Sequence, residues 1–357
     1  MKVAVLKEAS GEARVAAIPE TVKKFIALGA SVAVERGAGE GACLSDAAFA
    51  EAGATIEDRS ALLADADIIL CIAGPDDLSG TKRGALIVGA LDPVRRGDAV
   101  KAYADSGLEA LAMEWMPRIT RAQSMDILSS QSNLAGYKAV VDAASAFGRA
   151  FMGVGVAGLQ AIATGRRLGA QVSATDVRSA TREQIQSLGA KPIFVEHVAG
   201  IEGEGAGGYA GETSDEYKAA QAELVSSHIA KQDIVITTAL IPGRPAPRLV
   251  SDAQLATMRA GSVIVDLAAE AGGNVEGCVA GETVVVHGVT IIGARNLAGT
   301  LAADSSALFA RNLYNFLSSF WDKEAGRPLL ADEDEIVKAV RLTKDGKVVS
   351  ERLLVPA

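Results

Sequence analysis

The chain alternates short β-branched and aliphatic runs with amphipathic stretches of helical period, starting from its first residue. Residues 1–6 predict a strand, and residues 19–30 predict a helix with Pro19 in its first turn and Gly29 near its C-cap. Further strands are predicted within residues 31–39, 54–57, 66–73, 84–91 and 108–115. Such alternation is typical of a parallel sheet with helices on both faces, which places the chain in the α/β class.

A second strand–helix series follows residue 137, with apolar runs within residues 171–178, 191–196, 232–240, 261–268 and 289–296. A long helix with one apolar face is then predicted from about Ala302 to Trp321, and a hairpin turning at Asp345–Gly346. We expect two domains, each a doubly wound parallel sheet. The first is predicted to be discontinuous, at residues 1–129 plus 302–357, and the second to occupy residues 130–301.

The composition and charge of the chain argue against several classes of function. A length of 357 residues exceeds one ordinary domain, and 49% hydrophobic residues suit a chain that builds a core. The net charge of -9 argues against binding nucleic acid or an anionic membrane surface, since both need clustered Lys and Arg. The three Cys and three His are scattered, so no metal site is predicted. No apolar run is long enough to span a bilayer, so no direct membrane insertion is expected.

The glycines at 153, 155 and 158 fit the pattern G-x-G-x-x-G, followed by a helix, a strand and then Asp176. In a dinucleotide site the glycines allow a tight turn, close backbone approach to the pyrophosphate and close helix–strand packing. An acid at the position of Asp176 binds the adenosine ribose hydroxyls and disfavours a 2′-phosphate, although Arg178 lies close by. The pattern therefore predicts that the second domain binds NAD(H).

This motif lacks the parallel strand that should enter it. The preceding residues 139–151 predict helix, and only Met152 separates them from Gly153. A strand of ~5–6 residues with a connection has no sequence from which to form. Either residues are absent from this sequence, or the first strand of the domain is lost. We favour the first alternative, because a sheet without its central strand would leave a large apolar gap.

Two polar segments have unusual composition. Residues 203–217 are rich in glycine and acid around Tyr209, which predicts a mobile surface loop that is either a solvated linker or a flap over the nucleotide. Residues 117–133 join the two predicted domains and interleave Arg, Gln, Asp, Ser and Asn with apolar residues. Because ligands often lie between domains, we expect an ordered functional loop there rather than a plain linker.

The sequence shows no nucleophile elbow, Walker loop or zinc-protease motif. No His or Lys is placed where it would donate a proton to a carbonyl. Hydride transfer between two nicotinamide rings needs neither acid, base nor metal, but requires positioning and exclusion of water. A scarcity of catalytic residues is therefore expected for that reaction.

Several long segments closely resemble the NAD(H)-binding domain I of proton-translocating transhydrogenase alpha subunits, namely residues 121–137, 153–170, 175–178, 236–247 and 266–274. Residues 7–20 resemble the start that these proteins share with alanine dehydrogenases. The resemblance implies two Rossmann-like domains, a homodimer, NAD(H) on this chain and NADP(H) on a partner subunit. It also implies a separate membrane subunit that translocates protons, so that the chain would lie in the cytoplasm, peripheral to the inner membrane.

The resemblance also assigns residues. Arg118, Gln123 and Asp126 match the family's Arg-Gln-Asp loop at the nicotinamide end of NAD(H), and are the predicted catalytic residues. The predicted nucleotide contacts are Ser129, Asn133, Tyr137, Gly153, Val154, Gly155, Val156, Gly158, Asp176, Val177, Arg178, Gly208, Tyr209, Gln221, Thr238, Ala239 and Leu240.

Two other functions remain as alternatives. The first is a stand-alone dehydrogenase of the alanine dehydrogenase kind. Residues 71–77 lack the substrate-binding Lys and residues 89–93 lack the catalytic His of those enzymes, and Arg14 alone cannot bind and protonate a keto acid. The second is a non-catalytic NAD-binding module, which gains weight if the strand before Gly153 is truly missing.

Overall fold

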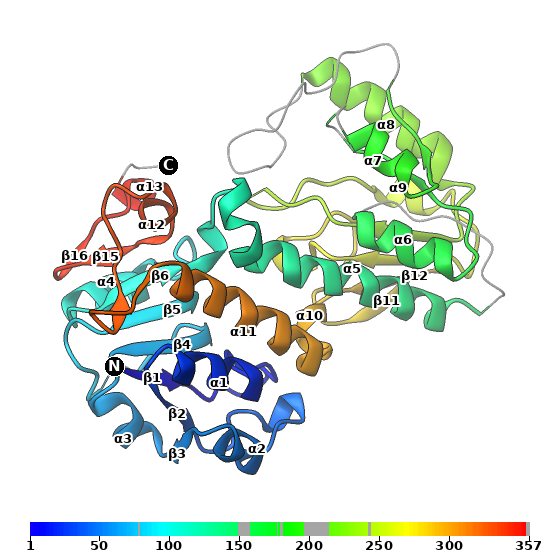
Figure 1. Cartoon of the computed structure of the whole chain (residues 1–357). Helices are drawn as coiled ribbons and strands as arrows, with labels where there is room; N and C mark the ends of the chain where they lie inside the picture. Colours follow the sequence, from blue (N-terminus) through cyan, green and yellow to red (C-terminus); the bar gives the residue numbers. More distant parts are fainter. Residues whose placement is uncertain are drawn as a thin grey trace. The chain divides into compact units, whose positions relative to one another are not determined.

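The computed structural model describes residues 1–77, 79–148, 158–176, 178, 181–195, 214–241 and 244–354. The chain divides into two compact units (Figure 1): unit 1 is Met1–Gln131 with Ala298–Ala357, and unit 2 is Ser132–Leu297. The predicted boundaries at 129 and 302 lie a few residues from these. Both observed boundaries fall in helices, α5 (Ile127–Ala146) and α10 (Leu297–Thr300), and a helix offers no composition change to mark a boundary.

Unit 1 contains a six-stranded sheet of order β3-β2-β1-β4-β5-β6 in which every neighbouring pair is parallel. The first strand, β1, is central and pairs with β2 on one side and β4 on the other. The strands are β1 (Lys2–Val5), β2 (Ser31–Glu35), β3 (Thr55–Glu57), β4 (Ile68–Ala73), β5 (Leu86–Ala90) and β6 (Glu109–Ala112).

Helices cover both faces of this sheet, as parallel strands require. Successive residues of β1 point to opposite faces, so Val3 and Val5 join one core while Ala4 and Leu6 join the other. The first core includes Phe25 of α1 and apolar side chains of α11, which packs on the same face of the sheet. The helices of unit 1 are α1 (Pro19–Ala27), α2 (Asp46–Glu51), α3 (Arg59–Ala64), α4 (Gly97–Asp105), α11 (Ala302–Ser319), α12 (Glu335–Val340) and α13 (Glu351–Leu354), with 3-10 turns η1 (Glu40–Ala42), η2 (Met113–Trp115) and η3 (Thr120–Met125).

The C-terminal segment completes unit 1. Phe25 of α1 and Tyr314 of α11 pack edge to face with ring centroids 5.2 Å apart. The hairpin of β15 (Thr343–Lys344) and β16 (Lys347–Val348) lies beside β6 and α4 (Figure 1), and the Thr343 hydroxyl donates to the Leu108 carbonyl at 2.8 Å. This hairpin covers the edge strand, which would otherwise expose unpaired backbone groups. The predicted turn is confirmed, since Asp345 and Gly346 both have positive φ. A shorter hairpin joins β13 (Trp321–Asp322) and β14 (Arg327–Pro328).

Unit 2 has two separate sheets among the residues that the structure describes. One has the order β11-β12-β10-β9, and the other is the parallel pair β7–β8. The predictions missed β11, which is antiparallel to β12. The strands are β7 (Ser173–Ala174), β8 (Lys191–Pro192), β9 (Ile234–Thr237), β10 (Val263–Asp266), β11 (Thr283–Val286) and β12 (Val289–Gly293).

The helices of unit 2 pack on these sheets. Helix α5 contributes Ala139, Val140 and Ala143 to a core shared with β9 and β10. The other helices are α6 (Leu159–Arg167), α7 (Thr181–Ser187), α8 (Asp215–Ile229) and α9 (Asp252–Leu255), with the 3-10 turn η5 (Ala269–Ala271). Among the helices of the described residues, none combines the length and the apolar character needed to cross a membrane.

Candidate functional site

In parallel α/β sheets, ligands bind at the carboxyl ends of the strands, where the connecting loops converge. Unit 2 has two such edges among its described residues, one after β7 and one after β9 and β10. The predicted contact Asp176 follows β7, and the predicted contacts Thr238–Leu240 follow β9. Each predicted contact therefore lies at the carboxyl end of its own strand, where a ligand is expected.

Asp176 is half-buried and already engaged by Arg178. The Arg178 backbone N–H and Nε both donate to Oδ1 at 2.9 Å, and Nη2 donates to Oδ2 at 2.8 Å. A carboxylate offers about four lone-pair positions, so Oδ2 can still accept one more hydrogen bond. Burial, and secondly the nearby Asp176 carboxylate, raise the pKa of Tyr217 on α8. Asp176 is thus oriented by Arg178 and close to a buried tyrosine.

The loop after β9 leaves the sheet at Thr237, whose Cα pairs with that of Asp266 on β10. Thr238 and Ala239 are half-buried, and Leu240 is exposed. Ala239 is held on both sides by Asn274, which accepts its N–H at 3.0 Å and donates to its carbonyl at 2.9 Å. Residues 266–274 belong to the segments that resemble the transhydrogenase family, but the sequence predicts no role for Asn274. The signal that could have found it is a polar residue after two glycines that follow a buried strand.

The predicted catalytic segment lies in unit 1, around η3. Ala122 and Met125 are buried in the core, while Gln123 is exposed, as is Arg118 before η3. The carbonyl of Ser124 accepts from Asn312 Nδ2 at 2.8 Å and from Asn315 Nδ2 at 3.0 Å, both on α11. Buried anchors and two amide donors therefore fix the backbone on both sides of Gln123.

Asp126 caps helix α5. Its Oδ1 accepts the Ser129 N–H at 2.9 Å, and its Oδ2 accepts the Ser129 hydroxyl at 2.5 Å, which satisfies a donor at the start of the helix. The prediction that residues 117–133 form a loop is wrong from Ile127 onward, because those residues are helical. Ser129, Asn133 and Tyr137 are all exposed and are spaced four residues apart, so they share one face of α5.

The remaining predicted residues divide into two groups. Gly158 has φ 74° and directly precedes α6, and Gln221 lies half-buried on α8. The others lie outside the described residues: Gly153, Val154, Gly155, Val156, Val177, Gly208 and Tyr209. The first two glycines of the motif and residues 203–213 of the predicted loop thus lie outside the described residues. The prediction that this loop extends to residue 217 is wrong, because α8 begins at Asp215.

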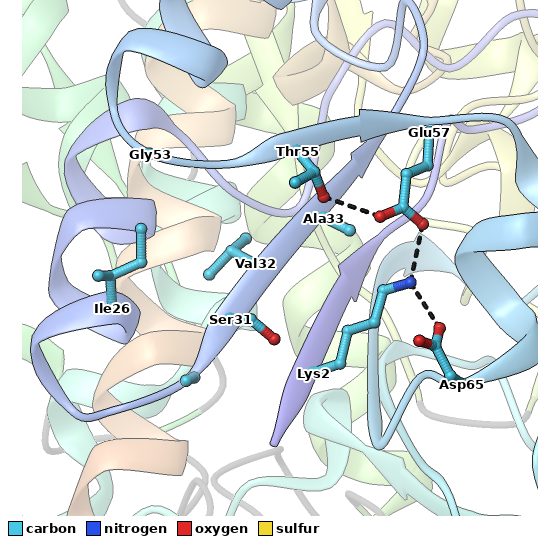
Figure 2. A pocket seen from close by; sticks show the side chains of 10 residues that line it. Lys2, Ile26, Ser31, Val32, Ala33, Gly53, Thr55, Glu57 and Asp65 are labelled. Carbon is cyan, nitrogen blue, oxygen red and sulfur yellow. Dashed lines mark hydrogen bonds and ion pairs between the residues drawn. The ribbon is translucent and has the colours of Figure 1, made fainter.

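A pocket of about 370 Å³ lies at the amino-terminal edge of the six-stranded sheet of unit 1 (Figure 2). Lys2, Ser31 and Thr55 begin β1, β2 and β3, and Glu57, the last residue of the short strand β3, completes the polar lining with Asp65. Lys2 Nζ donates to Glu57 Oε2 at 2.7 Å and to Asp65 Oδ1 at 2.5 Å, so its charge is satisfied within the protein. Because this is the amino edge of the sheet, we do not assign the nucleotide to it.

Two half-buried carboxyls at the carboxyl edge of unit 1, Glu8 and Glu114, were not predicted. Glu8 accepts the N–H groups of Ile72 and Ala73, and burial raises its pKa to about 7. Burial likewise raises the pKa of Glu114 to about 7, although its carboxyl accepts the N–H groups of Leu91 and Asp92. Each carboxyl bridges the end of a neighbouring strand, a long-range arrangement that no local sequence pattern reveals.

The chain matches two family models along most of its length. Residues 4–135 match the N-terminal domain of alanine dehydrogenase/PNT, and residues 127–351 match its C-terminal domain. A curated relative, an NAD(P) transhydrogenase alpha subunit of Rhodospirillum rubrum, is 48% identical over 379 residues, covering 99% of each chain. That alignment is longer than the 357 residues of this chain, so the relative has residues without a counterpart here.

Other relatives are likewise more similar when they are transhydrogenase subunits than when they are alanine dehydrogenases. An NAD(P) transhydrogenase alpha subunit of Rickettsia prowazekii is 44% identical over 98% of this chain and 96% of its own length. Alanine dehydrogenase of Halomonas elongata is 30% identical over 98% of this chain and 94% of its own. The crystal structure of transhydrogenase from Sinorhizobium meliloti matches with a TM-score of 0.87 and 48% identity, over 98% of this chain and all of that one. The chain belongs to the alanine dehydrogenase/PNT family, and to the transhydrogenase alpha subunits within it.

Proposed function

We propose that the chain is the NAD(H)-binding component of a proton-translocating NAD(P) transhydrogenase. It would exchange hydride directly between NAD(H) on unit 2 and NADP(H) on a partner subunit, coupled to proton translocation by a membrane subunit. The observation that carries this proposal is the 48% identity to a transhydrogenase alpha subunit over nearly the whole of both chains. Dimerisation and peripheral attachment to the inner membrane through those partners belong to the same proposal.

The carboxyl edge of unit 2 supports binding of NAD(H) in preference to NADP(H). Among the described residues, Arg178 occupies three of the acceptor positions of Asp176, which leaves one for a ribose hydroxyl, and a carboxylate there would repel a 2′-phosphate. Arg178 offsets some of that repulsion, because its guanidinium is bound to the same carboxylate. We therefore expect selectivity that depends on Asp176 but is not absolute.

Hydride transfer between two nicotinamide rings requires the protein side chains to position the rings and not to react. The two nicotinamide rings supply the hydride donor and acceptor, so no protein group has to move a proton. Arg118, Gln123 and Asp126 would act by orienting the nicotinamide end, and η3 suits that task because its backbone is anchored by α11. The orienting roles of these three residues are part of the proposed function.

The alternative of a stand-alone alanine dehydrogenase loses support at Arg14. Its Nε and Nη2 donate to Glu12 at 2.8 and 2.6 Å, and its Nη1 donates to Gln131 at 2.8 Å. With only 13% of its side chain exposed, this guanidinium is committed to the protein rather than to a substrate carboxylate.

The test is a titration of the purified full chain with NADH and NADPH, followed by fluorescence of the reduced nicotinamide. An NADP-binding transhydrogenase domain is then added, and hydride exchange is measured in the same sample. We expect binding of NADH in preference to NADPH, and exchange only with the partner domain present. Oxidation of NADH by the chain alone with pyruvate and ammonia would instead establish the dehydrogenase, and binding of neither nucleotide would refute both.

A further inference from the structure

Strands β9 and β10 end together, with the Cα of Thr237 paired to that of Asp266. The Asp266 side chain is fully buried at this edge. Its Oδ2 accepts the backbone N–H groups of Asn274 at 2.7 Å and Val275 at 3.0 Å, and its Oδ1 accepts that of Ala268 at 2.9 Å. A buried carboxylate with three backbone donors folds the segment after β10 back onto the end of the strand.

The return of this segment depends on two glycines. Gly272 and Gly273 have φ of 99° and 77°, which residues with a Cβ rarely adopt. A Cβ added to Gly273 would also lie 3.0 Å from Asp266 Oδ2. The turn therefore needs glycine both for its conformation and for the close approach to the carboxylate, and it delivers Asn274 to the loop that follows β9.

Asn274 uses its whole amide on that loop. It is fully buried, accepts the Ala239 N–H, and donates to the carbonyls of Ala239 at 2.9 Å and Pro247 at 2.8 Å. Its own carbonyl accepts the N–H groups of Leu249 and Val250 at 2.8 and 3.0 Å. One residue thus fixes both peptide groups of Ala239 and the far end of the same loop.

We propose that Asn274, itself held by Asp266, is a positioning residue that sets the conformation of Thr238–Leu240 for contact with NAD(H). This inference rests on the proposed function, because it takes that loop as a nucleotide contact. The loop keeps a free hydrogen-bonding group at its base: within the described residues the Thr237 hydroxyl, on a residue only 5% exposed, has no partner. Because the loop is already ordered before the nucleotide binds, binding has a smaller conformational-entropy cost to offset.

The experiment compares Asn274→Asp with Ser262→Ala in the full chain. Asn274→Asp keeps the shape and the acceptor for Ala239, but places a carboxylate oxygen against two carbonyls. Ser262 lies next to the other end of β10, where its buried hydroxyl donates to the Gln232 carbonyl at 3.2 Å, so its loss tests a buried hydrogen bond away from the loop. Asp266→Asn is the second variant, in case Asn274→Asp does not fold. The readouts are NADH affinity, the melting temperature, and amide hydrogen exchange in residues 237–241.

We expect Asn274→Asp to weaken NADH binding by ~10-fold and to speed exchange in residues 237–241, because the loop loses its anchors. Ser262→Ala should lower the melting temperature and leave NADH affinity within about 2-fold. A lower melting temperature with unchanged affinity in Asn274→Asp and Asp266→Asn would overturn the inference and leave the proposed function standing. Wild-type protein that fails to bind NADH would overturn the proposed function itself.

Discussion

The two units differ in how their strands are arranged. In unit 1 the order β3-β2-β1-β4-β5-β6 places β1 at the centre, paired on both sides. In unit 2 the described strands give β8–β7 and, separately, β9–β10–β12–β11. Residues 149–157, which come shortly before α6, lie outside the described ranges.

The hydrophobic cores of the two units differ in the same way as their sheets. Unit 1 has one large apolar cluster on each face of a continuous sheet, each with residues from β1, β4 and β5. The described residues of unit 2 form three smaller apolar clusters, and one of these consists of residues on and around α6, α7, β7 and β8. The comparison therefore predicts that unit 1 is the more stable unit.

Matched truncations of one isoleucine in each unit test this difference. Ile69 of β4 is 1% exposed and has strands on both sides, whereas Ile236 of β9 is 2% exposed and pairs, among described strands, only with β10. We expect Ile69→Ala to lower the free energy of unfolding by ~4 kcal/mol and Ile236→Ala by ~2 kcal/mol, because a less enclosed site relaxes more easily around a cavity.

Urea unfolding separates the two effects, since both tryptophans, Trp115 and Trp321, lie in unit 1. Tryptophan fluorescence then follows unit 1, and hydrogen exchange of α6 and β9 peptides follows unit 2. Equal losses for the two variants, or a wild-type unit 2 that unfolds at higher urea than unit 1, would contradict the prediction that unit 1 is the more stable unit.

A smaller effect on the stability of unit 1 is expected from pH. Burial raises the pKa of Glu114 to about 7 in the folded protein, against 4.5 in the unfolded chain. The folded state therefore holds a proton that the unfolded chain releases. The resulting stability is full below pH 4.5 and is lost as the pH rises to about 7, on the order of 3 kcal/mol if the shift is fully expressed.

Glu114→Gln should flatten this slope, so that the difference in unfolding free energy between wild type and variant changes between pH 5 and 8. Glu20 is the control, because the side chain of Lys24 and then that of Arg311 lower its pKa. Glu20→Gln should alter the slope slightly and with the opposite sign, since its contribution is lost as the pH falls. A slope in Glu114→Gln identical to wild type would contradict the assignment, and exchange in unit 2 peptides serves as the internal reference.

Sequence predicted much of unit 1 because its strands are continuous apolar runs and its turns carry their own signals. The Asp345–Gly346 turn is an example of a local rule that held. The start of α5 was missed because Ser129 and Asn133 lie on its exposed side, and such polar residues hide the helical period. Strand β11 was missed because it alternates exposed and half-buried residues and runs against the parallel pattern of its neighbours.

The site was predictable only where a motif is local. Asp176 follows the glycine pattern at a known distance, so its position at the carboxyl edge could be expected. The link between Asn274 and Ala239 joins residues 35 apart, and that between Glu114 and Asp92 joins residues 22 apart. Such hydrogen bonds exist only once the strands have been set side by side, so no sequence spacing encodes them.

Hydrogen exchange of the full chain with and without saturating NADH tests most directly whether the carboxyl edge of unit 2 is the nucleotide site. We predict slower exchange in residues 237–241 and in the first turn of α6, from Leu159, because these backbone groups would be covered by the nucleotide. Peptides lining the pocket at the amino edge of unit 1, such as those around Lys2 and Thr55, should not change (Figure 2). Protection around Lys2 and Thr55, with none in residues 237–241 while NADH is bound, would contradict the assignment of the site to unit 2.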